Sequence, residues 1–192
     1  MKLARITPIF KQGDKSSPSK YRPISILPIL SKVFVKHVNV CLTNFLTKNE
    51  AINYLQAGFR IGHSHTNSFH KILSDVTYKK QKQITVAMFL DFRKAFDYVN
   101  HQILYPKLKN FNIEGSSLQL LKSYLVDRRY FVGFSNQVSK VLPIAVGVWQ
   151  GSILAPTLIL TFVNDLLTWC FSSSAHAYAG DTTITCSHSD FH

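Results

Sequence analysis

Acidic residues are scarce in this sequence. Of its 192 residues, 22 are Lys or Arg and 10 are Asp or Glu, which gives a formal net charge of +12. The only glutamates are Glu50 and Glu114. Hydrophobic residues nevertheless make up 46% of the chain, which is typical of a globular domain and excludes a disordered basic tail. A folded chain with this charge favours a polyanionic partner, such as a nucleic acid, over an acidic protein.

Cysteine is also scarce. The three residues, Cys41, Cys170 and Cys186, are odd in number and show no C-x-x-C spacing, which argues against a disulfide framework and a zinc ribbon. The N-terminal segment, MKLARITPIFKQGDK, lacks the apolar core of a signal peptide. We therefore expect an intracellular location, in the nucleus or the cytoplasm, and no secretion.

One uncharged stretch, residues 141–164, is long enough to span a bilayer. It contains Pro143, Gly147 and Pro156, however, and Gln150-Gly151 lies near its middle. A spanning helix would leave the backbone groups freed at these positions unsatisfied in hydrocarbon. We interpret the stretch as a strand, a loop and a buried helix, and we expect no membrane partner.

The order of predicted elements is typical of an α+β fold, and no repeat or linker divides the chain. Apolar spacing predicts helices that begin near Ser31 and Thr66 and helices over 99–109, 117–126 and 152–169. The predicted strands are 84–90, buried on both faces, 130–134 with 137–146, and a hairpin of 175–178 with 182–186. On the first two helices, we expect the core to contain Phe34, Val38, Cys41, Leu42, Phe45, Leu46, Phe69, Ile72, Leu73 and Val76.

Two aspartates lie where a side chain leaves a rigid edge. Asp91 follows the apolar run ITVAMFL, and Asp181 lies in a tight turn between two apolar strands. Carboxylates in such places can bind hard cations such as Mg²⁺. Spacing alone favours a simpler interpretation, in which Asp91 caps the next helix and Asp181 forms the turn.

Five motifs occur in a fixed order along the chain: YRPIS, AGFRIGHSHT, FLDFRKAFDYVNH, GVWQGSILAPTLILTFVNDL and AYAGDTTI. Together they resemble the reverse transcriptase domain of non-LTR retrotransposons, of the LINE type and jockey-like, from about residue 2 to about residue 184. The resemblance implies a partial right-hand polymerase fold, α+β, with fingers over about 1–83 and most of the palm over about 84–192. It further implies RNA-directed DNA synthesis from dNTPs on an RNA template and a DNA primer, by two-metal nucleotidyl transfer with Mg²⁺.

The motif FLDFRKAFD carries most of the implied chemistry. By resemblance, Asp91 and Asp181 are the catalytic, metal-binding carboxylates, and the backbone carbonyl of Phe92 is a further metal ligand. The resemblance also implies that Phe96 is the aromatic gate under the deoxyribose, which excludes a 2′-hydroxyl. Phosphoryl transfer needs cations at the attacking and leaving oxygens and few other protein groups, which agrees with this small set of residues.

Other motifs imply the nucleotide pocket. In WQGSILAP, Gln150 and Gly151 line the nucleotide and template pocket by resemblance. The segments PIFKQGD and YRPIS resemble the fingers, which implies that Lys11 and Arg22 reach the triphosphate, as a point charge and as a planar fork. Arg60, in GFRIGHS, is expected to contact the template or the protein rather than the metal centre.

The chain departs from the family pattern at the hairpin. Where the family reads YADD, this sequence reads YAGD, so Gly180 replaces the first acid. We expect two carboxylates in place of three and an impaired or inactive polymerase. Trp149 and Ala155 also replace the usual Pro and Gly of the family. Because the sequence ends soon after the hairpin, we expect a fragment of a degenerating element without a thumb.

Alternatives remain at this stage. The chain could be a catalytically dead, basic nucleic-acid-binding module, a relic without function, or a chain with no stable native state because a palm-sheet edge is uncovered. The histidines His63, His65 and His70 lack the paired spacing of a zinc site. Five basic residues are either phosphate contacts or solvated ends of elements: Lys79, Lys80, Lys82, Arg128 and Arg129.

Overall fold

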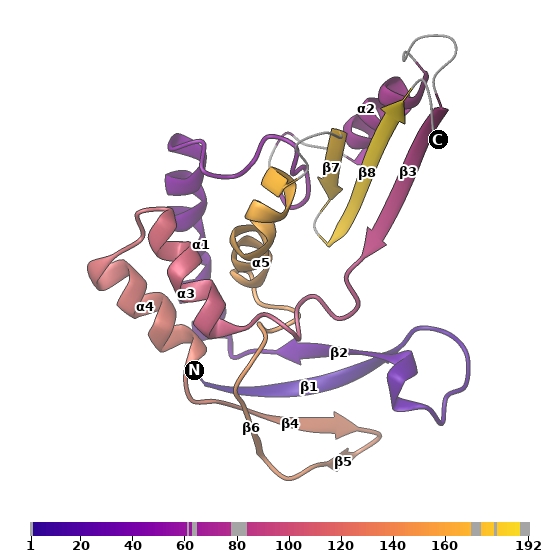
Figure 1. Cartoon of the computed structure of the whole chain (residues 1–192). Coiled ribbons are helices and arrows are strands. Elements are labelled where there is room, and N and C mark those ends of the chain that lie inside the picture. Colours follow the sequence, from indigo (N-terminus) through magenta and orange to yellow (C-terminus); the bar gives the residue numbers. More distant parts are fainter. Residues whose placement is uncertain are drawn as a thin grey trace.

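A computed structural model describes residues 2–60, 62, 65–77, 84–169, 174–178 and 180–188, which form two β-sheets and a group of helices (Figure 1). The strands are β1 Leu3–Phe10, β2 Tyr21–Ile26, β3 Ile84–Asp91, β4 Arg128–Phe134, β5 Gln137–Val138, β6 Leu142–Ile144, β7 Ser174–Tyr178 and β8 Asp181–His188. The α-helices are α1 Ile29–Lys48, α2 His65–Thr77, α3 His101–Asn110, α4 Gly115–Leu125 and α5 Ala155–Val163. The mixed helix and sheet architecture predicted from the sequence is confirmed.

The larger sheet has the strand order β2-β1-β4-β5, and β6 adds to β4. β1 runs antiparallel to β2 and parallel to β4, so this sheet joins the start of the chain to its middle. In the predicted turn between β4 and β5, Ser135 and Asn136 have φ of 44° and 65°, as a two-residue type I′ hairpin turn requires. On one face of β1, Ala4 and Ile6 are buried in a cluster with Trp149.

The smaller sheet has the order β3-β8-β7, with β3 at its edge. Beyond β7, a parallel bridge between Gln56 and Ala177 extends the sheet, and α2 packs on β7 and β8. The prediction that β3 is buried on both faces is wrong, because Val86, Met88 and Phe89 are 51%, 55% and 74% exposed. An apolar run of strand length is compatible with an edge strand and with a central one, and long-range pairing decides between them.

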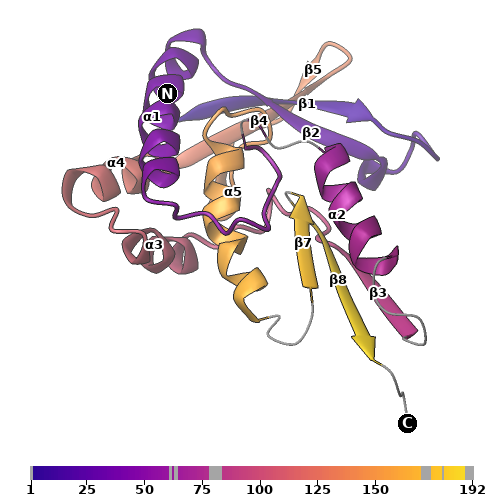
Figure 2. The ribbon, with the colours of Figure 1, turned by 90° about the horizontal axis from the view of Figure 1, so that it is seen from above.

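α5 lies between the helices α1, α3 and α4 on one side and the smaller sheet on the other (Figures 1 and 2). It packs against α1 and α3, and its Leu158 is fully buried together with Leu104 and Leu108 of α3. The interpretation of residues 141–164 as a strand, a loop and a buried helix is confirmed. Within the described residues, no helix has the length and apolar character needed to cross a membrane.

The inward faces of α1 and α2 are partly different from the prediction. α1 buries Ser31, Val35, Leu42 and Leu46. Expected core residues that are exposed instead are Phe34, Cys41, Phe45, Phe69 and Leu73. The apolar side chains of α1 are spread over a wider arc of the helix than the part that packs against neighbouring elements. The periodicity of the sequence does not reveal which part of that arc is packed.

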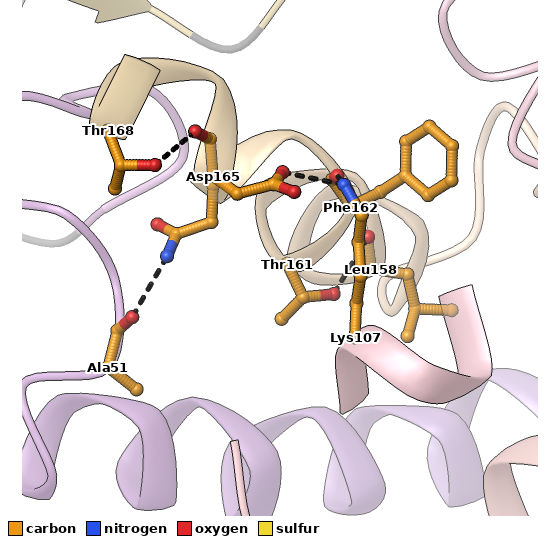
Figure 3. A network of polar contacts seen from close by, with 8 residues as sticks. Ala51, Lys107, Leu158, Thr161, Phe162, Asp165 and Thr168 are labelled. Carbon is orange, nitrogen blue, oxygen red and sulfur yellow. Dashed lines mark hydrogen bonds and ion pairs between the residues drawn. The ribbon is translucent and has the colours of Figure 1, made fainter. Parts of the chain in front are cut away.

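A polar network holds the end of α5 (Figure 3). Lys107 of α3 donates to the carbonyl oxygen of Phe162 at 2.5 Å and to a carboxylate oxygen of Asp165 at 2.6 Å. Asn164 donates to the carbonyl oxygen of Ala51 at 3.1 Å. The chain continues as a 3-10 helix, Asn164–Trp169, so the helix predicted over 152–169 is shorter and changes type at Asn164. These contacts fix α5 to α3 and to the segment that follows α1.

Candidate active site

The structure brings Asp91 and Asp181 together. Asp91 is the last residue of β3, Asp181 is the first residue of β8, and the two are direct partners in the antiparallel register. Residues opposite each other in such a pair have side chains on the same face, with Cβ atoms about 5 Å apart. Both side chains are exposed. Two acids that are 90 positions apart in the sequence therefore form one acidic pair at the end of the smaller sheet.

Gly180 lies beside this pair. Its carbonyl oxygen accepts a hydrogen bond from the Phe92 N–H at 3.4 Å, which joins the hairpin to the residue after Asp91. A Cβ at position 180 would lie 3.7 Å from the Ala95 Cβ and 4.0 Å from the Phe92 Cβ, which is ordinary van der Waals contact. Gly180 is also absent from the glycines with positive φ. Neither space nor backbone conformation requires glycine here, so an aspartate side chain would fit.

The donor set around the pair fits a hard divalent cation, but with few ligands. Asp91 and Asp181 supply carboxylate oxygens, and the Phe92 carbonyl oxygen is engaged by the Ala95 N–H at 3.3 Å with a lone pair remaining. Among the residues that the structure describes, no group of three or more His, Cys, Asp or Glu side chains could hold a metal ion. The position that would add a third carboxylate is Gly180.

Phe96 is partly buried next to the motif that contains Arg60. Its ring packs edge to face on Phe59, with ring centroids 6.5 Å apart, and its carbonyl oxygen accepts from the Val148 N–H at 2.7 Å. Arg60 donates to the carbonyl oxygens of Asn53 and Gln56, at 3.1 Å each. Of the two contacts expected for Arg60, with the protein or with the template, the structure shows the contact with the protein.

Gln150 and Gly151 join three motifs. The Gln150 side-chain amide donates to Asp97 at 2.8 Å, and the Gln150 carbonyl oxygen accepts from the Ser25 N–H at 2.7 Å. Gly151 has φ of +114°, and a Cβ there would lie 2.7 Å from the Ser25 carbonyl oxygen. Sequence reasoning did not identify Asp97 as a partner of Gln150, although it follows Phe96 in the same motif.

Lys11 and Arg22 lie on the hairpin of β1 and β2. The Lys11 N–H donates to the Lys20 carbonyl oxygen at 2.9 Å, and Arg22 pairs with Ile9 across the sheet. Both side chains are exposed. Over the described ranges, no hydrogen bond or ion pair joins either residue to the acidic pair. The positively charged side chains of Lys11 and Arg22 are therefore available to a ligand.

Arg128 is neither a phosphate contact nor a solvated end, because it is 1% exposed. Its guanidinium donates to the Gly147 carbonyl oxygen at 2.5 Å and to the Leu125 carbonyl oxygen at 2.9 Å, and it lies 5.0 Å from the Trp149 ring centroid. His101 Nε2 lies 2.8 Å from the same Gly147 oxygen. Arg129 is exposed, so both interpretations stay open for that residue.

Burial shifts the ionisation of this cluster. Loss of solvent has the largest effect and lowers the pKa of His101; the hydrogen bond to Gly147 raises this pKa in part, and the nearby Arg128 charge lowers it by a smaller amount. Loss of solvent also raises the pKa of Tyr124, which is hydrogen-bonded to Ser152 at 2.6 Å. The lowered pKa favours the neutral imidazole, and the carbonyl oxygen of Gly147 can only accept, so Nε2 is the donor in this contact.

Some predicted features lie outside the described residues. They are His63, Lys79, Lys80 and Lys82. Trp149, which replaces the usual proline of the family, is 3% exposed and belongs to the core beside β1. Its side chain therefore fills space under the larger sheet.

Comparison with known proteins identifies the family of this chain. A family model described as Reverse transcriptase (RNA-dependent DNA polymerase) matches residues 9–192. In Drosophila melanogaster, a probable RNA-directed DNA polymerase from transposon X-element is 36% identical over 167 residues, and the RNA-directed DNA polymerase from mobile element jockey is 34% identical over 169. These alignments cover 86% and 87% of this chain but 18% of each relative, so the chain spans a small part of their length.

Solved structures show the same fold at low identity. The structure of telomerase from Candida tropicalis in complex with a TWJ fragment of telomeric RNA aligns over 98% of this chain and 36% of its own, with a TM-score of 0.70 and 13% identity. The apo form from the same organism gives a TM-score of 0.68 over 98% of this chain and 40% of its own, at 13% identity. On its motifs, its fold and its family match, the chain belongs to the reverse transcriptase (RNA-dependent DNA polymerase) family and is similar to the domains of that family in jockey-like, non-LTR retrotransposons.

Proposed function

We propose that this chain forms the fingers and palm of an RNA-directed DNA polymerase, and that its catalytic step is impaired. The proposed division places the fingers over about 1–83 and the palm over about 84–192. Strands β1 and β4 pair across the boundary between these two parts. The observation that supports the proposal best is the register in which Asp91 is opposite Asp181, beside Gly180. Acids from two separate motifs thereby share one sheet end, where both could contribute oxygens to one divalent cation.

The acidic pair and the Phe92 carbonyl oxygen would hold Mg²⁺. When bound, the ion would neutralise charge that develops on the transferred phosphoryl group. The carboxylates of Asp91 and Asp181 are exposed, so a triphosphate and a primer end can reach them. The work of the rest of the chain is to position these substrates.

Positioning would come from three motifs. Phe96, packed on Phe59, would lie under the sugar of the incoming dNTP. Gln150, bonded to Asp97, would line the nucleotide and template pocket with Gly151. From the β1–β2 hairpin, two further residues would bind triphosphate oxygens: Lys11 as a point charge and Arg22 as a planar fork.

The impairment follows from Gly180. Two carboxylates stand where the resemblance implies three, and glycine offers no side-chain ligand. Loss of a direct ligand to a catalytic metal should cost about 4 kcal/mol of transition-state stabilisation, roughly a thousandfold in rate. The backbone at Gly180 accepts a side chain, so this defect should be reversible by one substitution.

A nucleic-acid-binding module without catalysis is the second candidate. The net charge of +12 favours it, because phosphate contacts by Lys and Arg provide affinity without any chemistry. It requires no intact metal site. The two candidates differ in whether a restored carboxylate restores synthesis.

Primer extension on an RNA template with Mg²⁺ and dNTPs separates them. We expect Gly180→Asp to extend the primer roughly a thousandfold faster than the natural chain. The matched control is Gly180→Asn, which has the same shape without the charge, and it should resemble the natural chain. Adding Asp91→Asn to Gly180→Asp should abolish the gain. Equal rates for Gly180→Asp and Gly180→Asn, in proteins that bind the template, would refute the polymerase proposal and leave the binding module.

A further inference from the structure

The loop before Gln150 is held by a buried guanidinium. Arg128 is 1% exposed, and its Nη2 and the Nε2 of His101 both reach the carbonyl oxygen of Gly147, at 2.5 Å and 2.8 Å. The two nitrogens are 3.2 Å apart. A carbonyl oxygen has two lone pairs, so the Nε2–H of His101 and an N–H of Arg128 can donate to it together.

The other side of Gly147 is equally constrained. Its N–H donates to the Val99 carbonyl oxygen at 2.8 Å, and its φ is +81°. A Cβ on Gly147 would lie 2.7 Å from the Asp97 carbonyl oxygen. The loop is therefore pressed against Asp97, the residue that accepts the hydrogen bond from Gln150.

The guanidinium also covers the next part of the loop. Its carbon lies 5.0 Å from the ring centroid of Trp149, within the range of a cation–π contact. Arg128 thus touches Gly147 and Trp149, the residues on either side of Val148, immediately before Gln150. Its Nε bond to Leu125 fixes the guanidinium to the end of α4.

The buried charge of Arg128 destabilises the folded state. No ion pair to Arg128 occurs in the described part of the chain, and its Nη1 is buried without a hydrogen-bond partner. A buried charge without a counter-ion is destabilising, and an apolar replacement of similar size is often neutral or stabilising. Global stability is therefore a poor explanation for this arginine, whereas the placement of the loop is a direct one.

We infer that Arg128 is a positioning residue that, with His101, sets the loop 145–151 so that Gln150 faces the nucleotide pocket. The importance of this position for nucleotide binding rests on the proposed polymerase function. The effect of Arg128 on the conformation of the loop does not. Arg128 itself lies behind the loop, buried under Trp149, and would not touch the nucleotide.

Hydrogen–deuterium exchange on the whole chain tests the inference without any activity. We expect Arg128→Met to speed exchange of the loop amides in 145–151, including Gly147 and Val148, by about tenfold or more, while amides of α5 exchange as before. Arg128→Lys should give a smaller increase than Arg128→Met, because an ammonium group can keep a carbonyl contact but lacks the planar fork that makes both carbonyl contacts and the stacking on Trp149. The matched control is Arg129→Met, the exposed neighbour on the same strand, which should change neither segment.

The contrary results are distinct. Unchanged loop exchange in Arg128→Met would overturn the inference. Equal acceleration in the loop and in α5, up to complete unfolding, would assign Arg128 to global stability and also overturn it. In the Gly180→Asp protein, Arg128→Met should also raise KM for the dNTP about tenfold with a smaller change in kcat. If the Gly180→Asp protein does not extend the primer, that result counts against the polymerase proposal. The hydrogen–deuterium exchange result still decides the role of Arg128.

Discussion

His101 shows how a single buried side chain responds to its surroundings. His101 is 7% exposed, and its Nε2 lies 2.8 Å from the Gly147 carbonyl oxygen and 3.2 Å from the Arg128 guanidinium. Burial lowers its pKa in the folded state, and the positive charge of Arg128 acts in the same direction. Between the folded and the ordinary pKa, the unfolded chain therefore binds a proton that the folded chain does not bind.

This difference predicts the pH dependence of stability. As the pH falls from about 7 toward 5, the free energy of unfolding should decrease, because protonation favours the unfolded chain. His101→Gln should remove that part of the decrease, whereas His37→Gln, at an exposed position, should leave it unchanged. Urea unfolding at several pH values provides the measurement. An identical pH slope in the natural chain and in His101→Gln would contradict the assignment.

The loop and the hairpin that carry the candidate site use glycine differently. Gly151 has a positive φ and is pressed against Ser25, whereas Gly180 has neither constraint. We expect Gly151→Ala to lower the free energy of unfolding by about 2 kcal/mol or more, since it adds a strained φ and a clash with backbone. Gly180→Ala should change it by less than about 1 kcal/mol, because alanine fits there and restricts the unfolded chain. Denaturant midpoints of the two variants test this, and similar losses at both positions would contradict it.

The hairpins were more predictable from sequence than the packing of single elements. Ser135-Asn136 marks its turn by residue type, and both residues take the positive φ that a two-residue turn requires. Gly180 also indicates the second hairpin, although its backbone conformation there does not require glycine. The exposure of Phe89 on β3 and of Phe34 on α1 depends on which element lies opposite, and no local pattern contains that information. The parallel pairing of β1 with β4 and the contact of Arg128 with Gly147 are likewise long-range. For the site, the motifs identified Asp91 and Asp181 by resemblance, and the register of β3 with β8 supplied their proximity.

The net charge of the chain and the exposed edge strand β3 favour two different kinds of interaction. A net charge of +12 favours nucleic-acid binding, while exposed Val86, Met88 and Phe89 on β3 favour self-association. The helical core around α5 is continuous, with Leu104, Leu108 and Leu158 fully buried. We therefore expect a folded chain with a sharp, cooperative thermal transition and a tendency to associate through β3.

Binding to RNA should depend steeply on salt. If several phosphates are neutralised by Lys and Arg, the affinity for an RNA template should fall about a hundredfold or more between about 50 and 200 mM salt. Fluorescence anisotropy with a labelled RNA–DNA primer–template measures this directly. Affinity that is unchanged over this range would exclude the charge as the source of binding, and with it the binding-module alternative.

The acidic pair is the central element of this account, and its affinity for a divalent ion tests it most directly. Mn²⁺ can be titrated by electron paramagnetic resonance with primer–template and dNTP present. We expect Asp91→Asn and Asp181→Asn each to weaken Mn²⁺ binding at least about tenfold, and Asp127→Asn, at an exposed position of another loop, to leave it unchanged. Equal Mn²⁺ affinity in the natural chain and in all three variants would show that Asp91 and Asp181 do not form a metal site.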